Sequence, residues 1–417
     1  MQLKTILNRV LKFKSFVYGA VRWATETEVP TLEVELHRRA NSQPVCSCCR
    51  RPSPGYDRLP ERRFEFIPFW GIKVFLLYAP ARVSCPRCGI KVEMMPWATG
   101  KRRLTDPYAW FLSRWAKRLS WKEVAEAFHT TWDHVFCSVE MAVAWGREHV
   151  DLSGIVSIGI DEIQWKKGHK YLTLVYQIDN HCKRLLWIGN KRKVKTLLGF
   201  FRWFGQQRSD ALRYVCSDMW QPYLNVIAKK AKHAINVLDR FHIVAHLSKA
   251  IDKVRAEEVR ALKAKGAIPV LTKTRWLLLK RPENLTETQE VKLAELLKYN
   301  LKTVRAYLLK EEFQLFWRYV SPFWAGWFLD RWCTKTMRSK IDPMKKVARM
   351  LRAHRSLLLN WFHARRRLSS GVVEGFNTKA KLTMRKSFGF RTYHSAEIAL
   401  YHALGALPEP KCAHKFF

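Results

Sequence analysis

The chain has 417 residues, 48% of them hydrophobic, so sizeable cores can form and wholesale disorder is excluded. Lys and Arg number 75 and Asp and Glu 35, which leaves a net charge of +40. This excess opposes compaction unless a polyanion neutralises it, so nucleic acid is the leading partner and an anionic membrane surface the lesser one. The sequence has no uncharged stretch of about 18 apolar residues, so a membrane span is not expected.

Ten cysteines are too few for a disulfide scaffold in a chain of this length, and a reducing cytoplasm is the expected setting. The first 23 residues carry scattered basic side chains and are typical of a short basic amphipathic helix. Residues 32–37 alternate as in a strand, and the apolar run at 64–85 indicates further strands. We therefore expect residues 1–97 to form a basic segment and a small β-rich module.

Two Cys-x-x-Cys pairs flank these strands, Cys46 with Cys49 and Cys85 with Cys88. Pro and Gly beside the second pair favour the tight turn that points two thiolates at one ion, and four thiolates suit a closed tetrahedral zinc site. The spacing predicts a zinc ribbon with one structural Zn²⁺. Cys48 could replace Cys49 as a ligand, and buried free cysteines or a redox pair are the other interpretations.

The hydrophobic period becomes helical within residues 98–150. Ser120 can cap a short helix with Glu123 at its third position, and a second, longer helix follows after a short turn. This pattern is typical of a helix-turn-helix, although ordinary packed helix pairs share it. Lys122 and His134 are the candidate DNA contacts in this segment.

Residues 151–407 begin with three short β-rich runs, after which helix and strand alternate, which predicts a mixed sheet with packed helices. Residues of about 245–368 are helical, very basic and rich in Trp, and we expect a large all-helical insertion there. A last helical stretch ends near residue 407, and residues 408–417 form a tail. The expected fold class is multidomain α+β.

Acids are scarce in this chain, so acids at the ends of apolar strands are informative. Asp161 and Asp218 each follow a buried run, and carboxylates at strand ends converge at one edge of an α/β sheet. Neighbouring carboxylates repel each other unless cations intervene, and Mg²⁺ prefers oxygen ligands. Two Mg²⁺ (or Mn²⁺) ions about 3.5–4 Å apart suit in-line displacement at phosphorus. Glu374 is the candidate third acid; ordinary turn acids and a solvated helix acid are the alternative interpretations.

Other polar side chains accompany these acids in the sequence. Asn377 and Lys381 share a helical face with Glu374, at i+3 and i+7. We predict DNA contacts for Asn377, Lys381 and Arg385. The residues expected to support the acids from a second layer are Glu162, Asp239 and His242.

Together these motifs resemble DDE-type insertion-sequence transposases of the ISL-three group, in the same order and over most of the chain. The cysteine pairs and the helix-turn-helix stand where that group has its zinc finger and DNA-binding helices. GIDEI around Asp161, SDMW around Asp218 and VVEGFNTKAK around Glu374 resemble its catalytic blocks. DRFH at residues 239–242 and FGFR at 388–391 resemble further signatures, and the extra Cys48 departs from the pattern.

The resemblance implies an RNase H-like catalytic domain at 151–407, in which Asp161, Asp218 and Glu374 hold two Mg²⁺ ions. It implies an enzyme that binds the terminal inverted repeats of an insertion sequence, cleaves DNA strands and transfers them to target DNA. The implied partners are double-stranded DNA and further copies of the chain, as a homodimer or a larger assembly. The implied location is the bacterial cytoplasm, in association with the nucleoid.

Two other classes of protein also fit parts of the sequence. A zinc-containing, sequence-specific DNA-binding regulator would explain the charge, the cysteines and the helix-turn-helix, but it would not need the three acids. A structure-specific RNase H-like nuclease would use the acids to cut DNA without joining it. Metal-dependent nicking separates the first class from a transposase, and a strand-transfer assay separates the second.

Overall fold

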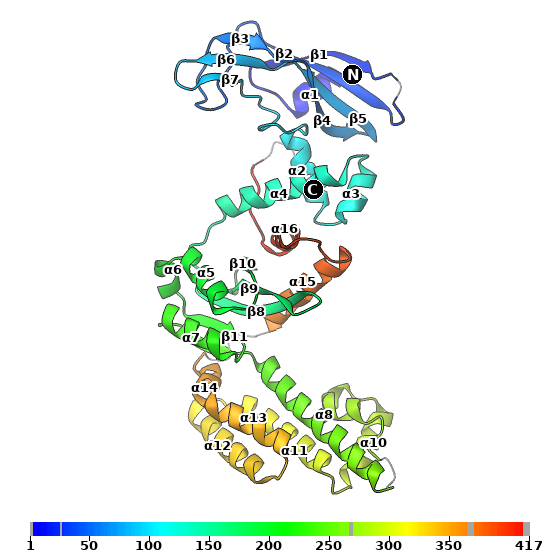
Figure 1. Cartoon of the computed structure of the whole chain (residues 1–417), viewed down its shortest axis with the longest axis vertical. Coiled ribbons are helices and arrows are strands. Elements are labelled where there is room, and N and C mark those ends of the chain that lie inside the picture. The colour runs from blue at the N-terminus through cyan, green and yellow to red at the C-terminus, as the bar shows by residue number, and fades with distance from the viewer. Residues whose placement is uncertain (1–2, 26, 267–269, 365–370, 412–417) are drawn as a thin grey trace. The chain divides into compact units, whose positions relative to one another are not determined.

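The computed structural model divides into two compact units (Figure 1), one formed by residues 1–151 with 382–417 and the other by residues 152–381. The residues that the structure describes are 3–25, 27–266, 270–364 and 371–411. Within these ranges, no helix is long and apolar enough to cross a membrane. The last helix groups with the first unit, whereas the sequence pattern placed it in the domain that carries the acids.

The first unit begins with helix α1 (Leu3–Val10) and a four-stranded sheet. The predicted N-terminal helix is wrong beyond Val10, because the alternating residues that follow pair as the first strand of this sheet. Trp97 is fully buried on the sheet, and its ring lies 4.8 Å from that of Phe16 and 5.1 Å from that of Tyr78. In spatial order the strands are β1 (Phe16–Trp23), β2 (Thr31–Arg38), β5 (Ile72–Tyr78) and β4 (Arg62–Phe69).

A smaller three-stranded sheet adjoins the first. It consists of β3 (Gly55–Arg58), β6 (Ala81–Cys85) and β7 (Gly89–Val92). The turn between β6 and β7 carries the second cysteine pair, and Gly89 has φ +71°, a left-handed conformation that favours glycine. The buried carboxylate of Glu93 accepts hydrogen bonds from the Tyr78 hydroxyl and the Ala81 backbone N–H, both at 2.6 Å, and it pairs with Arg38. Glu93 thereby links the two sheets.

The helical part of the first unit contains the predicted pair of helices, α3 (Trp121–Ala127) and α4 (Trp132–His149). The predicted capping box is confirmed: the Ser120 hydroxyl accepts from the Glu123 N–H, and the Glu123 carboxylate accepts from the Ser120 N–H. Helix α2 (Asp106–Trp115), which precedes this pair in the chain, packs on α4. Helix α16 (Tyr393–Leu404) also packs on α4, where Glu397 pairs with Arg147 at 3.4 Å.

The second unit contains one five-stranded mixed sheet with the strand order β10-β9-β8-β11-β12. The first three strands along the chain are antiparallel hairpin neighbours, whereas β8, β11 and β12 run parallel. Parallel neighbours place their carboxyl ends at the same edge of the sheet. The bounds are β8 (Ser157–Lys166), β9 (Lys170–Ile178), β10 (Lys183–Asn190), β11 (Tyr214–Ser217) and β12 (Ile235–Leu238).

Helices α5 (Val194–Phe204) and α7 (Gln221–Lys230) cover the sheet with a core of Phe200, Phe204 and Tyr223, and the short α6 (Gln206–Asp210) joins them. The predicted helical insertion then follows β12. Its core includes Phe313, Phe316 and Trp332 and continues to Leu224 of α7 and Leu238 of β12. Its α-helices are α8 (Arg240–Ala264), α9 (Arg275–Leu279), α10 (Glu287–Leu297), α11 (Lys302–Gln314), α12 (Pro322–Arg338), α13 (Asp342–Ala353) and α14 (Arg355–His363).

Helix α15 (Gly371–Lys386) returns to the sheet after this insertion. A Cβ atom at Gly159 of β8 would lie 2.4 Å from Val373 Cγ2, so only glycine permits this close approach. The rings of Tyr176 on β9 and Phe376 on α15 stack at 5.0 Å between centroids. Gly159 therefore sets how closely α15 docks on the sheet.

We expect Gly159→Ala to lower the free energy of unfolding by about 1–3 kcal/mol, because the added methyl group must push α15 from β8. Chemical denaturation of the whole chain, followed by tryptophan fluorescence, measures the change. Gly375→Ala on the same helix is the matched control. Nothing lies within 4 Å of its added Cβ, and alanine favours the helix by up to about 1 kcal/mol. Equal stability of the two variants would contradict the docking role of Gly159.

Candidate active site and metal centre

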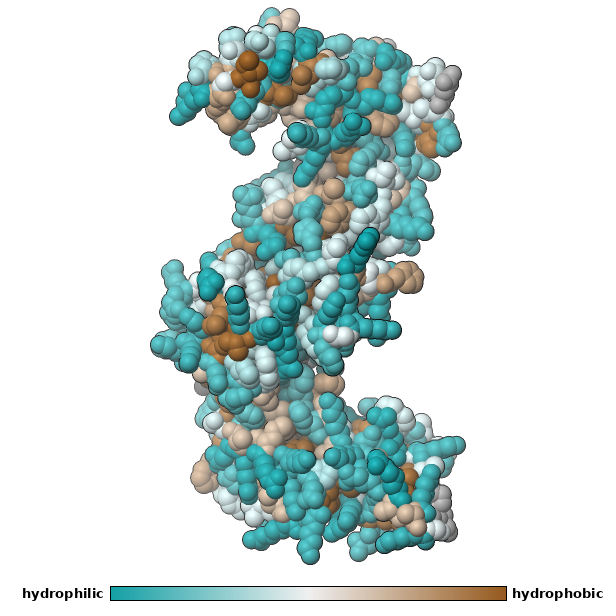
Figure 2. Space-filling view, in the orientation of Figure 1, coloured by the Kyte–Doolittle hydropathy of each residue, from teal (hydrophilic) through white to brown (hydrophobic). Residues whose placement is uncertain are grey.

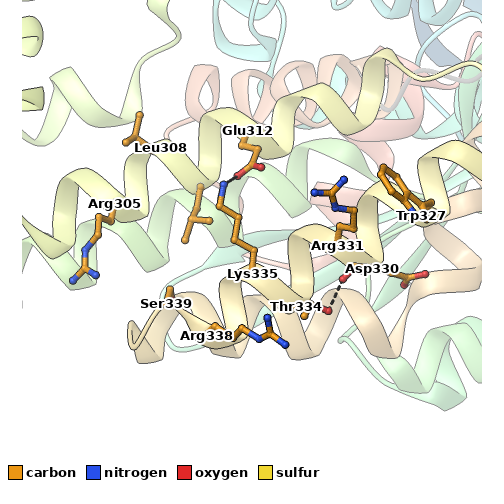
Figure 3. A pocket seen from close by; sticks show the side chains of 11 residues that line it. Arg305, Leu308, Glu312, Trp327, Asp330, Arg331, Thr334, Lys335, Arg338 and Ser339 are labelled. Carbon is orange, nitrogen blue, oxygen red and sulfur yellow. Dashed lines mark hydrogen bonds and ion pairs between the residues drawn. The ribbon is translucent and has the colours of Figure 1, made fainter.

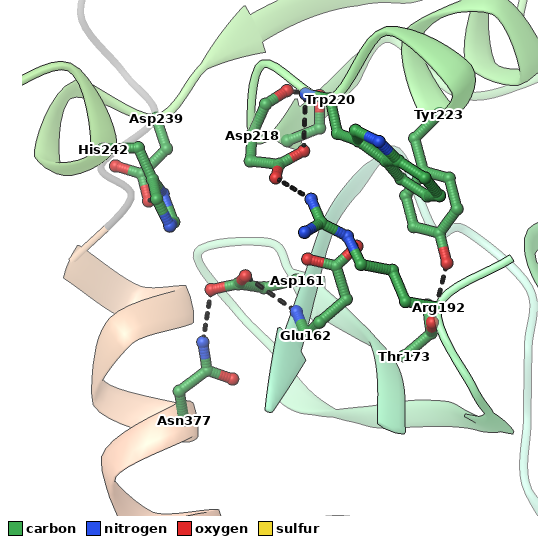
Figure 4. Close-up of polar contacts among 11 residues, drawn as sticks. Asp161, Glu162, Thr173, Arg192, Asp218, Trp220, Tyr223, Asp239, His242 and Asn377 are labelled. Atoms are coloured by element: carbon green, nitrogen blue, oxygen red, sulfur yellow. Dashed lines mark hydrogen bonds and ion pairs between the residues drawn. The ribbon is translucent and has the colours of Figure 1, made fainter. Parts of the chain in front are cut away.

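Three acids meet at the carboxyl edge of the parallel strands β8, β11 and β12 (Figure 4). Asp218 follows β11 and Asp239 follows β12, while Asp161 lies two residues beyond Gly159, the last β8 residue that pairs with β11. Burial raises the pKa of Asp161, and the nearby charges of Asp239 and Asp218 raise it further. The predicted convergence of Asp161 and Asp218 on neighbouring strands is therefore observed.

The expectation that Asp161 ends its strand is wrong. β8 continues to Lys166 because it stays paired with β9, where Gln164 lies opposite Tyr171. Its other neighbour, β11, is only four residues long and stops earlier. Asp161 thus lies within β8, just beyond the residues that pair with β11. Pairing with β9 fixes its backbone, and its side chain lies at the carboxyl edge of the parallel strands.

Arg192 lies among these acids and was not identified from the sequence. Its Nε donates to Glu162 Oε1 at 3.0 Å, and its Nη2 donates to Asp218 Oδ2 at 2.8 Å. The guanidinium also lies over the Trp220 ring, 4.4 Å from the centroid. Burial raises the pKa of Glu162 to about 8, with a further rise from Asp218, and Arg192 opposes this rise. In the sequence nothing distinguishes Arg192 from the adjacent Lys191 and Lys193.

Asp239 and His242 form a second polar pair at this edge. The Asp239 carboxylate accepts from the Phe241 backbone N–H at 2.7 Å and so caps the start of α8. Its other oxygen lies 3.0 Å from His242 Nδ1, and this hydrogen bond is the main cause of a His242 pKa raised to about 9. Asp161 and Asp218 raise the His242 pKa as well. The predicted supporting residues therefore do surround the two aspartates.

The polar residues of α15 differ in what they contact. Asn377 is buried: its Nδ2 donates to Asp161 Oδ2, and its Oδ1 accepts from the Tyr176 hydroxyl at 2.9 Å. Its amide is therefore bonded inside the protein, and the predicted DNA contact of Asn377 does not fit this position. Glu374, one turn earlier, is exposed, as are Lys381 and Arg385.

The predicted DNA contacts of the helix pair also differ from each other. Lys122 is exposed on α3, with Glu126 Oε1 3.6 Å from its ammonium group. His134 on α4 is turned toward the first sheet, because its Nδ1 lies 3.0 Å from Thr130 Oγ1 and 3.2 Å from Glu65 Oε2. Lys122 can reach a ligand in this arrangement, whereas His134 would first have to leave Glu65.

The four predicted zinc ligands cluster in the first unit. Cys46, Cys49, Cys85 and Cys88 place their sulfur atoms within 4.8 Å of one another, and Cys49 Sγ lies 3.5 Å from Cys85 Sγ. Backbone hydrogen bonding, first from the Arg87 N–H, lowers the pKa of Cys85 to about 6 and favours its thiolate. Cys48 is exposed and stands outside the group, so Cys49 fits the ligand position better.

The two groups of side chains suit different metals. A closed set of four sulfur ligands suggests zinc. The charge of Asp218 raises the pKa of the buried Asp161, and the carboxylate oxygens of these two residues suit a hard divalent cation. Among the described residues, the cysteines are the only group of three or more potential ligands whose ligand atoms all lie within 4.8 Å of one another. Glu374 does not complete such a group with the aspartates in this structure.

Comparison with known proteins identifies the chemistry that this arrangement serves. A transposase family model, that of the ISL3 (ISL-three) DDE enzymes, matches residues 158–399, more than half of the chain. The chain belongs to the ISL3 family of DDE transposases. The matched region begins in β8 and ends in α16, so it includes the converging acids, the helical insertion and α15. The protein is therefore an enzyme that acts on DNA, and its family implies divalent metal ions.

Full-length relatives extend this similarity beyond the matched region. The transposase for insertion sequence element IS1001 of Bordetella parapertussis is 29% identical over 379 residues, which cover 90% of this chain and 92% of the relative. The transposase for insertion sequence element IS1557 of Mycobacterium tuberculosis is 31% identical over 376 residues, which cover 83% and 82%. The similarity therefore spans most of both proteins.

We expect purified transposase to contain about one tightly held Zn²⁺ per chain, as a closed four-cysteine site requires. Cys85→Ser should remove the zinc and lower the melting temperature of the first unit, because the small sheet loses the ion that joins its turns. Elemental analysis and calorimetry measure both effects. Cys48→Ser should keep the full zinc content; a loss equal to that of Cys85→Ser would show that Cys48 is a ligand.

Proposed function

We propose that Asp161, Asp218 and Glu374 are the catalytic acids of a transposase that cleaves the ends of its insertion sequence and joins them to target DNA. The observation that carries the proposal is the hydrogen bond from Asn377 on α15 to Asp161 on β8. This contact holds α15 against the edge where Asp218 also lies. Glu374 lies one turn before Asn377 on α15 and its side chain is exposed, so its carboxylate would have to turn toward the two aspartates in the active complex.

The sheet supports an RNase H-like assignment for the catalytic domain. Three antiparallel strands followed by two parallel ones, with the first strand at the centre, place Asp161 and Asp218 on adjacent strands. The helical region α8–α14 lies between β12 and α15 in the chain, so it is an insertion before the third acid. These helices, which pack around a large apolar core, account for the long interval between Asp218 and Glu374.

The proposed reaction consists of two displacements at phosphorus. In the first, water attacks the phosphodiester at the element end and the P–O3′ bond of the element strand breaks, leaving a free 3′-hydroxyl. In the second, this hydroxyl attacks a target phosphodiester, and a target 3′-oxygen leaves. Two divalent ions held by Asp161, Asp218 and Glu374 would, when bound, activate the nucleophile and stabilise the charge that develops on phosphorus. Asn377 would keep the Asp161 carboxylate oriented, and Arg192 would hold Asp218.

The first unit would supply recognition of the double-stranded terminal inverted repeats. The zinc-ribbon module and the helix pair α3–α4 are the proposed DNA-binding elements, with Lys122 as one contact. On α15, Lys381 and Arg385 are exposed cations suited to DNA phosphates. Two ends must meet for joining, so we propose at least a homodimer on DNA. Incubation with labelled element ends, target DNA and Mg²⁺ tests the whole function, with nicked and joined strands as the products.

We expect Asp161→Asn, Asp218→Asn and Glu374→Gln each to lower cleavage and joining by at least about 100-fold, because each keeps its shape but loses a charge needed at the phosphate. Specific binding to element ends should stay largely intact in gel-shift measurements. Glu287→Gln, which alters an exposed acid of α10 in the same unit, is the matched control and should retain activity. Full activity of Glu374→Gln would leave Glu162 or Asp239 as the third acid.

We also expect end binding to weaken steeply with salt, because each phosphate neutralised by the protein releases counterions. The slope of log affinity against log salt should be at least about 6 in magnitude, at about 0.9 per phosphate contact. Fluorescence anisotropy at several salt concentrations measures it. Lys122→Gln should reduce the slope by about 0.9 if this residue contacts one phosphate. A nearly flat salt response of the unaltered protein would contradict binding through a basic surface.

A further inference from the structure

A cavity of 820 Å³ lies between helices α11 and α12 of the helical insertion, and none of the proposed catalytic acids lines it (Figure 3). Arg305 and Leu308 line it from one face of α11. Trp327, Arg331 and Arg338 line it from α12. Their intervals of four and seven residues place the α12 side chains in one row along about 16 Å of helix. The helical insertion as a whole presents a mainly hydrophilic surface on the face shown in Figure 2.

The side chains that line this cavity include more positive charges than their carboxylates neutralise. Its two acids are neutralised: Glu312 pairs with Lys335 at 2.8 Å, and Asp330 accepts from Arg355 Nε at 3.0 Å and Nη2 at 3.0 Å. Arg305, Arg331 and Arg338 make no ion pair with any carboxylate of the described residues. Three arginines around one concave surface repel each other, so an anionic ligand would stabilise them.

An aromatic surface lies beside these arginines. Trp327 is 46% exposed, although tryptophan is among the largest apolar side chains and usually packs inside. The Arg331 guanidinium lies 4.6 Å from its ring centroid, and Trp324 meets it edge-on at 6.1 Å. Contacts with the Trp324 indole and the Arg331 guanidinium restrict the Trp327 ring, which therefore offers a rigid face for stacking.

We propose that this cavity binds unpaired, single-stranded DNA, with a base stacked on Trp327 and phosphates on Arg305 and Arg338. Arginines that follow a backbone, together with an exposed aromatic ring, form the usual combination for single strands. In a duplex the bases are already stacked on each other and cannot reach the ring. A volume of 820 Å³ is also in the range of pockets for small ligands, so it suits one or two nucleotides and not a double helix.

This inference rests on the proposed function and names one of its substrates. Strand cleavage at an element end allows nucleotides near the cut to separate from their complement, which supplies an unpaired strand. The free arginines oppose docking of another copy of this chain, because the chain carries a net charge of +40. A second copy or another protein is therefore an outcome that would overturn the proposal.

The test uses the full-length protein without Mg²⁺, so it does not depend on catalysis. Fluorescence anisotropy compares a fluorescein-labelled oligothymidylate with a duplex of equal length. We expect Trp327→Ala to weaken single-strand binding by about 5- to 100-fold, the effect of losing one stacked base, and to change duplex binding by less than about twofold. Phe323→Ala is the matched control, since Phe323 is an exposed aromatic residue of α12 outside the cavity.

The phosphate contacts have an independent test in the salt dependence. Replacing both Arg305 and Arg338 by Gln should reduce the slope of log affinity against log salt for the oligothymidylate by about 1.4, at about 0.7 per phosphate on a single strand. Replacing both Lys346 and Arg349 by Gln removes the same charge from the exposed face of α13 and should leave the slope unchanged.

Three results would overturn the proposal. Equal weakening by Trp327→Ala and Phe323→Ala would show that the cavity ring has no special role. Equal loss of single-strand and duplex binding would indicate a general DNA surface or a misfolded insertion. Unchanged DNA binding in Trp327→Ala, with a changed sedimentation coefficient, would identify a contact between copies. If the variants of Asp161, Asp218 and Glu374 kept their cleavage activity, the proposed function would be contradicted. The binding results for the cavity would not change, so the two proposals can be separated.

Discussion

The crowding of carboxylates at one edge of the five-stranded sheet is the constraint on which the rest of the second unit depends. The charges of Asp218 and Asp239 raise the pKa of Asp161. Asp218 and Asp161 raise the pKa of Glu162 in the same way, so the carboxylates at this edge repel one another. Arg192 and His242 relieve part of this repulsion through direct hydrogen bonds. The positive charges that offset this repulsion come from side chains at the edge itself. The large net charge of the chain contributes less, because it is spread over the surface and screened by salt. Divalent ions, which the family implies, would offset the rest of the repulsion if they bound at this edge.

The same edge explains why α15 is packed so closely. Glu374, the proposed third acid, lies 156 residues after Asp218. A helix at that distance in sequence needs specific contacts to dock accurately. Gly159 permits the close approach, Tyr176 and Phe376 stack across the junction, and Asn377 ties the helix to Asp161. The insertion between β12 and α15 has a large apolar core that reaches Leu238 of β12, so its helices are anchored on the sheet.

The stability of the first unit is limited in a different way, because its three-stranded sheet is too small to bury much apolar surface. Its apolar cluster contains little beyond Cys46, Val83 and Cys85. A metal held by four cysteines would replace the missing hydrophobic core, as it does in small metal-bound modules generally. The buried Glu93, with its partners Tyr78 and Arg38, joins this sheet to the larger one. The two sheets and the helix pair thus belong to one compact unit.

Much of this organisation is local and could be predicted from the sequence. The cysteine spacing indicated the four-sulfur cluster, Ser120 and Glu123 predicted the start of α3, and the apolar runs before Asp161 and Asp218 indicated adjacent strands. Each of these depends on residues close in the chain or on a repeated pattern. The family itself followed from the order of such motifs, because each motif is short and continuous.

The tertiary structure alone decided which side chains meet across long intervals. It placed Arg192 between Glu162 and Asp218, turned Asn377 from an expected DNA contact into a partner of Asp161, and set His134 against Glu65. It also joined α16 to α4, although more than 240 residues separate Arg147 from Glu397. No sequence pattern marks one arginine of a basic run, or one amide of a helix face, as the residue that will contact the acids. That outcome depends on strand length, register and the close approach of elements, which only the folded chain determines.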